Sequence, residues 1–370
     1  MSDHIQDPRL TEGRWLRIPG PTPVPPPVLE AMAEPMIPHR GAEMSRLVGS
    51  LRDRLKEVHR TEGDVAVWSG SGSAGWEAAL QNSCRPGDHV VATVTGDSGH
   101  RFAEVAERLG LWVTRVEMPW GQAVTGQQLE DALERIGGVR AVLVTHNETS
   151  TGVTNPLKEL ARVARRHGAL VLVDAVSSAA AMPVEVDAWD LDWVISGSQK
   201  AWMCPPGLMI AAVSDRALQA AAGLSTPRFF WDVEKMASAF RKGQATTTPA
   251  IPLYRALDVA LGMMLDEGVE AMWERQATLG AWLRGQLKAN GLALYADEEV
   301  ASASLTAFRP PAGMSASTFR SMIRADSGIE VAVGQGPETE AVVRVGHMGW
   351  SHWPEMEATV ESIARVLRRE

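Results

Sequence analysis

The chain has 370 residues, of which 45% are hydrophobic and 22% are charged, as in an ordinary soluble globular protein. This length is enough for a large domain and a smaller one. The formal net charge of −9 argues against a general nucleic-acid-binding surface.

The first predicted segment is rich in proline. Residues 20–27 read Gly-Pro-Thr-Pro-Val-Pro-Pro-Pro. Proline fixes φ and disfavours a helical conformation in the residue before it, so we expect this segment to be extended rather than helical. It is either a linker into the first helix or part of a ligand site.

From residue 45 to 215, short apolar runs alternate with helix-length amphipathic stretches. Seven runs are predicted strands: 65–68, 90–94, 111–116, 141–145, 169–173, 193–196 and 208–213. Helical patterns between them include 76–82, 129–136 and 157–167. Nearly all-apolar strands are typical of sheets that are buried on both faces. The alternation therefore predicts an α/β fold with a mostly parallel sheet.

The pattern changes beyond residue 215. Residues 222–252 show no clear period, a long helical region is expected over 253–289, and the remainder reads as a smaller α+β domain. We therefore predict an N-terminal arm at 1–20, a large domain at 21–252 and a small C-terminal domain at 253–370.

Cysteine content and the N-terminus bear on location. Cys84 and Cys204 are the only cysteines, and neither has the spacing of a metal site. We expect two buried free thiols in a reducing compartment, although one disulfide is an alternative. Residues 1–7 lack the apolar core of a signal peptide, and no stretch approaches the roughly 20 apolar residues of a membrane span. These features predict a cytoplasmic protein.

A lysine and an aspartate at strand ends carry the main chemical signal. Lys200 closes Ser196-Gly197-Ser198-Gln199-Lys200, 26 residues after Asp174 at the end of another apolar run. Alone, such a lysine is usually a surface residue and such an aspartate a helix cap. Together they match the way proteins hold pyridoxal phosphate, with a Schiff base to the lysine and the aspartate on the pyridinium nitrogen.

A glycine-rich string, residues 70–75, follows the first predicted strand and precedes a helix. Backbone amides at a helix N-terminus attract phosphate. The string also satisfies the G-x-G-x-x-G pattern, with Asp97 22 residues beyond Gly75, so a dinucleotide site and a purely structural turn are alternatives. The hydroxyls of Ser71 and Ser73 favour a cup for a single phosphate.

Two further segments carry polar groups. Residues 146–152 read His-Asn-Glu-Thr-Ser-Thr-Gly and should lie at the same sheet edge as Asp174 and Lys200. Arg344 stands between apolar residues on a probable strand. A buried arginine needs an anionic partner, which is either a structural acid or a substrate carboxylate.

Together these segments resemble the class V aminotransferases of fold type I, in particular the alanine–glyoxylate and serine–glyoxylate (serine–pyruvate) group. The resemblance runs from Gly20 to His347, and its most specific pieces are Glu148–Gly152, Val173–Val176, Ser196–Lys200 and Pro205–Gly207. It implies a large domain built on a mostly parallel seven-stranded sheet, with a smaller C-terminal α+β domain.

The resemblance also implies roles for individual residues. Lys200 would form the Schiff base and move the proton, and Asp174 would bind the ring nitrogen. The remaining cofactor-binding positions would be Ser71, Gly72, Ser73, Thr149, Val176 and Gln199, with Gln244 and Thr247 supplied by the other subunit. Arg344 would bind the substrate carboxylate with the help of the backbone at Gly20. This arrangement requires a homodimer with shared active sites.

The sequence departs from the family at several positions. Ser98 stands where an aromatic residue usually stacks on the cofactor ring, so either His100 or Phe102 takes that role or the ring is less firmly held. Gln244 stands where many relatives have tyrosine, and Ser73 where some have histidine.

The expected activity is transfer of an amino group from alanine or serine to glyoxylate or pyruvate by a ping-pong mechanism. Arg344 predicts an α-carboxylate, and no second arginine is clearly placed for a dicarboxylic side chain. A pyridoxamine–pyruvate aminotransferase, or a relative with a specialised donor, is the runner-up. A cysteine desulfurase is rejected because both cysteines are misplaced, whereas a dehydrogenase and a non-catalytic ligand sensor are the more distant alternatives.

Overall fold

The structure is a computed structural model that describes residues 15–369. The predictions for residues 1–7, and most of the predicted N-terminal arm, lie outside the described residues.

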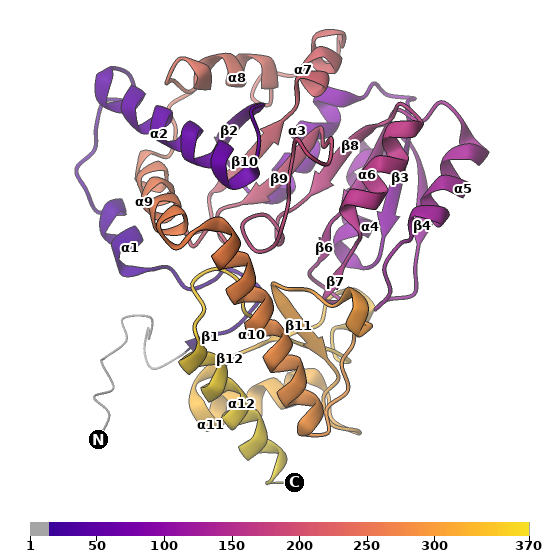
Figure 1. The fold of residues 1–370 in the computed structure, drawn as a ribbon, viewed down its shortest axis with the longest axis vertical. Coiled ribbons are helices and arrows are strands. Elements are labelled where there is room, and N and C mark those ends of the chain that lie inside the picture. Colours follow the sequence, from indigo (N-terminus) through magenta and orange to yellow (C-terminus); the bar gives the residue numbers. More distant parts are fainter. Residues whose placement is uncertain (1–14, 370) are drawn as a thin grey trace.

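A seven-stranded sheet forms the centre of the larger part of the molecule (Figure 1). Its strand order is β2-β10-β9-β8-β5-β3-β4, in which β10 is antiparallel to both neighbours and all other pairs are parallel. The strands are β2 (Asp64–Ser69), β3 (His89–Val94), β4 (Trp112–Glu117), β5 (Ala141–Thr145), β8 (Leu170–Asp174), β9 (Trp193–Gly197) and β10 (Leu208–Val213). The predicted fold class is confirmed.

All strands except the edge strand β4 are almost wholly buried, because other elements cover both faces of the sheet. This is why the apolar runs located every strand to within a residue or two. The helices of this part are α3 (Gly72–Ser83), α4 (Asp97–Arg108), α5 (Gly126–Ile136), α6 (Leu157–Arg166), α7 (Asp215–Ala222) and α8 (Val233–Arg241). Helix α3 begins at Gly72, ahead of the predicted 76–82, because the glycines of its first turn hide the helical pattern.

Two predictions near helix ends were wrong. Residues 20–27 are not wholly extended, since α1 (Pro26–Met32) begins within them. Proline is tolerated in the first helical turn, where its missing N–H has no partner to lose. The expected single helical region at 253–289 is two helices, α9 (Ile251–Glu267) and α10 (Val269–Ala289), separated at Gly268 with φ of 90°.

The smaller part of the molecule contains α10 and the chain that follows it (Figure 1). A three-stranded antiparallel sheet has the order β11-β14-β13, with β11 (Leu305–Phe308), β13 (Ala332–Val333) and β14 (Val343–Gly346). Helices α10, α11 (Ala316–Ser327) and α12 (Trp353–Leu367) supply its separate hydrophobic core. The N-terminal strand β1 (Trp15–Leu16) pairs in parallel with β12 (Ile329–Glu330) of this part.

The predicted domain boundaries remain predictions. Helix α9 packs against α1 and α2 (Ala42–His59), and its apolar residues belong to the core of the larger part, whereas the leucines of α10 belong to the second core. The two cysteines are free and buried, as predicted. Across residues 15–369, no helix is both long and apolar enough to cross a membrane.

Candidate active site

The candidate site lies where three parallel strands end side by side. β5, β8 and β9 are neighbours in the sheet, so their carboxyl ends lie at one edge. Asp174 is the last residue of β8, and Lys200 follows the end of β9 by three residues. A cavity of about 500 Å³ opens there and contacts both residues. Open α/β sheets bind ligands at this kind of edge.

The turn after β9 and the N-terminal segment hold Lys200. Thr22 donates from its backbone N to the carbonyl of Gln199 (3.0 Å) and from Oγ1 to the carbonyl of Lys200 (2.8 Å). The Lys200 ammonium donates to the Pro19 carbonyl. Burial, assisted by the positive charge of Arg344, lowers the pKa of Lys200 to about 8, while Asp174 opposes the shift.

Gly20 permits this close approach of backbone to Lys200. A Cβ at this position would lie 2.5 Å from Lys200 Cδ and 2.7 Å from Nζ, and its φ of +105° is a conformation that side chains rarely adopt. The segment on either side of Gly20 therefore forms one wall of the cavity directly against the lysine.

Asp174 is a buried carboxylate with few partners. The backbone N of Val176 donates to its Oδ1 at 3.0 Å. Burial raises the pKa of Asp174 to about 7, and the negative charge of Glu148 adds to the effect, whereas Val176, Trp76 and Lys200 oppose it. A carboxyl group so placed gains most from a cationic ligand in the cavity, as a protonated pyridine ring would be.

The glycine-rich string leads directly into a helix N-terminus. Ser71 is the N-cap of α3, and Gly72 and Ser73 form its first turn, all three lining the cavity. A Cβ on Gly72 would lie 2.5 Å from Val176 Cγ2, so only glycine fits there. Gln199 also lines the cavity, and its side-chain NH₂ group can donate to an anion there. Free amides and a positive helix end suit a phosphate group.

Arg344 reaches the cavity from the smaller part of the molecule. Its Nε donates to the Val333 carbonyl (2.8 Å), and its Nη1 donates to the Thr149 carbonyl and to Gln335 Oε1 (both 3.0 Å). Burial lowers the pKa of Arg344 to about 10, although Glu148 and Asp97 oppose the shift. No described acid lies within ion-pair distance of its guanidinium, so Nη2 is left for an anion.

Glu148 organises this edge of the sheet, a role that was not predicted for it from the sequence. It is fully buried, and its carboxylate accepts from the backbone N of Ser98 (3.2 Å) and Gly99 (3.0 Å) at the start of α4. It also accepts from the N (3.0 Å) and Oγ (2.7 Å) of Ser150. The acid thus ties two loops that flank the cavity, and it stabilises the positive end of α4.

The polar loop at 146–152 divides between two cavities. Thr149 lines the smaller one and donates from Oγ1 to Ser177 Oγ at 2.9 Å. His146 donates its backbone N to the Asp174 carbonyl (3.0 Å), but its imidazole lines a larger, mainly apolar cavity of about 1350 Å³. Burial lowers the pKa of His146 to about 4, so this ring is neutral near pH 7.

Several residues on the cavity lining were not singled out from the sequence, among them Trp76, Arg101, Arg320 and Gln335. The sequence places no second arginine clearly for a dicarboxylic side chain, whereas in the structure two further arginines besides Arg344 line the cavity. Arg101 and Arg320 lie on helices α4 and α11. In the sequence of an amphipathic helix, an arginine usually indicates a position on the solvent-exposed face. No local pattern could have identified them.

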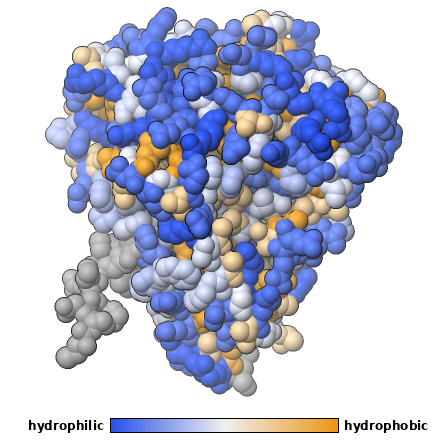
Figure 2. All heavy atoms as spheres, viewed as in Figure 1, coloured by the Kyte–Doolittle hydropathy of each residue, from blue (hydrophilic) through white to orange (hydrophobic). Residues whose placement is uncertain are grey.

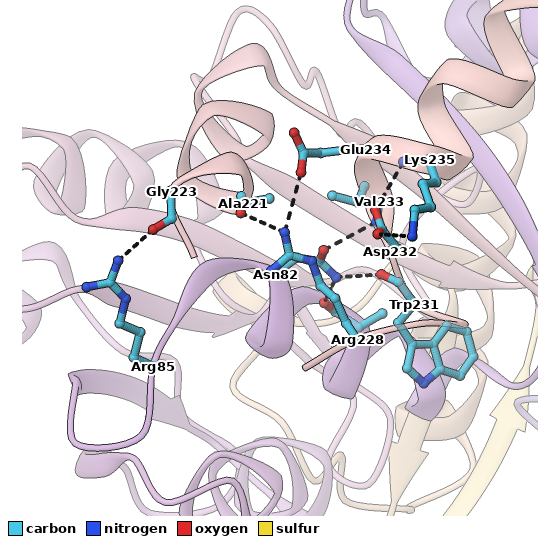
Figure 3. Close-up of polar contacts among 11 residues, drawn as sticks. Asn82, Arg85, Ala221, Gly223, Arg228, Trp231, Asp232, Val233, Glu234 and Lys235 are labelled. Atoms are coloured by element: carbon cyan, nitrogen blue, oxygen red, sulfur yellow. Dashed lines mark hydrogen bonds and ion pairs between the residues drawn. The ribbon is translucent and has the colours of Figure 1, made fainter. Parts of the chain in front are cut away.

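Gln244 and Thr247 lie on the surface and do not line the cavity of their own chain. The segment that leads to them is anchored on α3 (Figure 3). Asn82 Nδ2 donates to the Trp231 carbonyl (2.6 Å), and the backbone N of Val233 donates to Asn82 Oδ1 (3.3 Å). The same segment exposes Phe229, of which 84% is accessible.

Comparison with known proteins places the chain in one family. The model of the class-V aminotransferases matches residues 14–349. The "Soluble hydrogenase, small subunit" of Synechococcus sp. is 38% identical, with 97% of this chain and 94% of that protein covered. The L-aspartate–glyoxylate aminotransferase of Paracoccus denitrificans is 35% identical, with 92% and 87% covered. The crystal structure of an alanine–glyoxylate aminotransferase from Nostoc sp. superimposes with a TM-score of 0.92 at 30% identity, with 98% and 97% covered.

Proposed function

The chain belongs to the class V aminotransferases and is a pyridoxal-phosphate-dependent aminotransferase, and from this premise we propose that it moves the amino group of alanine or serine to glyoxylate or pyruvate in a ping-pong reaction. The supporting observation is that Lys200, Asp174 and Arg344, which are far apart in the sequence, line one cavity. No two of them alone would suffice for the reaction.

The residues around the cavity fit the cofactor. Ser71, Gly72, Ser73 and Gln199 would hold the phosphate, Asp174 the ring nitrogen, and Thr149 and Val176 the ring itself. When bound, pyridoxal phosphate supplies an aldehyde that reacts with amines and a protonated ring that accepts electrons from the carbon that loses its proton. The raised pKa of Asp174 means that this carboxyl ionises readily only beside such a cation.

Lys200 is the group that binds the cofactor aldehyde and carries the proton. With a pKa lowered to about 8, a useful fraction of its Nζ is neutral near physiological pH and can accept a proton. We assign to Nζ the removal of the proton from the substrate α-carbon and its later return. The Pro19 carbonyl, which accepts from this ammonium, orients it.

Arg344 would bind the α-carboxylate of the amino acid and then that of the 2-oxo acid. Its hydrogen bonds to Val333, Thr149 and Gln335 hold the guanidinium plane, and a planar guanidinium binds carboxylates through paired hydrogen bonds. The Gly20 backbone would close the opposite side of the substrate.

Aspartate is a second candidate donor, because Arg101 and Arg320 also line the cavity. Arg320 is partly balanced by Glu330 at 3.7 Å, whereas Arg101 lies over the ring of Trp76. A second carboxylate on the substrate could pair with Arg101. The Paracoccus relative named for aspartate agrees with this alternative.

The site would be completed by a second copy of the chain. Hydrophobic side chains gather beside α9 on the surface (Figure 2), and Leu29 and Met36, at and just after α1, are 48% and 67% exposed. Phe229 and Phe230 add to the exposed apolar surface. We propose that a second copy of the chain covers these exposed apolar side chains. In such a homodimer, Gln244 and Thr247 would reach the partner's phosphate site. A cytoplasmic location remains a prediction.

The decisive experiment removes the amine. After incubation with pyridoxal phosphate and reduction by borohydride, the wild-type protein should carry the cofactor on a peptide that contains Lys200, as read by mass spectrometry. Lys200→Ala should lose this label, the visible absorbance band and turnover, whereas Lys235→Ala, on the exposed face of α8, should keep all three. Labelling or turnover that survives in Lys200→Ala would falsify the proposal.

A donor panel identifies the substrate. Wild-type protein loaded with cofactor is mixed with alanine, serine, aspartate or pyridoxamine, and loss of the visible band is followed by stopped flow. Alanine or serine should react fastest. If aspartate reacts fastest and Arg101→Ala removes only that preference, the second candidate donor is correct.

A further inference from the structure

Position 98, where the resemblance places an aromatic residue against the cofactor ring, is a serine in this chain. Ser98 does line the cavity, so its position is as expected and only its size is wrong. Neither predicted substitute fills the gap. Phe102 is buried and does not line the cavity. His100 is also not among the described residues that line it.

Trp76 lines the same cavity as Ser98 but comes from a different helix. It belongs to the first turns of α3, immediately after the phosphate-binding positions, and it lines the cavity together with Asp174 and Ser98. Its side chain is 4% exposed. A large indole that is buried and still borders a polar ligand cavity is placed for contact with a ligand.

The packing around the indole holds it rigidly. Phe102 stacks on Trp76 with ring centroids 5.5 Å apart and an interplanar angle of 22°, and the Arg101 guanidinium lies 5.4 Å from the ring centroid. Both residues belong to α4, whose start is tied down by Glu148. Phe102 thus supports the indole from behind instead of contacting the cavity itself.

The indole N–H of Trp76 is a buried hydrogen-bond donor. No described residue accepts a well-formed hydrogen bond from Trp76 Nε1, although the group is buried. It nevertheless lies close enough to the Asp174 carboxylate to lower its pKa. A buried N–H is normally paired, so this donor is available to Asp174 once that carboxylate is ionised.

We propose that Trp76 replaces the missing aromatic residue at position 98, with its indole as the aromatic contact of the cofactor ring and its Nε1 as a donor that orients Asp174. Trp76 is a positioning residue in this scheme. This role rests on the proposed cofactor roles of Lys200 and Asp174. In this chain the aromatic residue that contacts the cofactor ring would come from α3 instead of α4.

The main test measures cofactor affinity without turnover. Pyridoxal phosphate is titrated into cofactor-free protein, and its dissociation constant is read from the visible absorbance band. Trp76→Leu should raise the dissociation constant about tenfold, because the stacking contact is lost. The double variant Trp76→Leu/Ser98→Trp should recover most of that loss by restoring an aromatic ring from the α4 side. Trp112→Leu, an exposed tryptophan on β4, should leave the constant unchanged.

Trp76→Phe separates the two roles and guards against misfolding of the leucine variant. It should keep the affinity at pH 8, because a ring remains, but bind more weakly than the wild type below pH 7, because Asp174 loses a donor. Tryptophan emission gives an independent reading, since cofactor binding should quench Trp76 strongly and this component should be missing in Trp76→Phe.

The possible failures are distinguishable. If the wild-type protein does not bind pyridoxal phosphate, the proposed function itself is wrong. If the wild type binds, but Trp76→Leu has an unchanged dissociation constant or Trp76→Phe loses no quenching, the role of Trp76 alone is overturned and the reaction at Lys200 stands.

Discussion

Two cavities border the ends of β5 and β8, and they differ in the charged groups that surround the buried ionisable residue in each. Asp174 lines the smaller cavity and His146 the larger one, and the two residues are joined by a hydrogen bond of 3.0 Å between their backbones. Burial drives both toward the neutral form, by raising the pKa of Asp174 to about 7 and lowering that of His146 to about 4.

The neighbours of each group make the difference. Asp174 shares its cavity with Lys200 and Arg344, two partly or wholly buried cations that a ligand can engage. The charged residues around the larger cavity, such as Lys158 and Asp297, are exposed to solvent and impose little on His146. A buried ionisable group therefore becomes a reactive site only where oppositely charged buried groups face the same space.

The largest effect should follow from removing the charge of Asp174. Asp174→Asn keeps the shape of the side chain but cannot stabilise a protonated ring, so we expect kcat to fall about 10²–10³-fold. Steady-state kinetics with saturating cofactor measures this loss. If kcat stays within a few-fold of the wild-type value, the charge of Asp174 does not contribute to catalysis.

A smaller effect should follow from weakening the frame of that cavity. Glu148→Gln replaces an acceptor of four hydrogen bonds with an amide whose NH₂ faces donors, and we expect a loss of about 1–3 kcal/mol in the free energy of unfolding. Urea denaturation measures it. Glu104→Gln, an exposed acid on the same helix α4, is the matched control and should change stability little.

The smallest effect on activity is expected in the larger cavity. His146→Leu should leave kcat at pH 8 unchanged, since His146 lines the larger cavity and not the one that holds Lys200 and Asp174. Its effect should instead appear as a change in acid stability, measured as Tm between pH 7 and pH 4.5.

The sign of that change follows from proton binding. In the unfolded chain histidine has a pKa near 6.5, whereas the pKa is lowered to about 4 for His59 and His146 and to about 3 for His347 in the folded protein. The unfolded state therefore binds more protons between these values, and stability is lost as pH falls below about 6.5. Removing His146 should reduce this loss. An unchanged or steeper fall of Tm would contradict a buried, neutral imidazole.

The strands of the sheet, and the proximity of Asp174 to Lys200, could be predicted from local sequence patterns. Strands covered on both faces must be apolar along their whole length, so each one is visible as a short hydrophobic run. Asp174 and Lys200 follow such runs directly, and parallel strands bring their carboxyl ends to one edge. The same local logic identified the glycine-rich start of α3.

The other residues that line the cavity become visible only in the folded chain. Glu148 meets Ser98 across 50 positions of sequence, and Arg344 meets Thr149 across 195. Trp76, Arg101 and Arg320 lie on helices, where their residue types are compatible with many environments. Their proximity to Lys200 results from packing between elements that are distant in the chain, and no local spacing of residues encodes such packing.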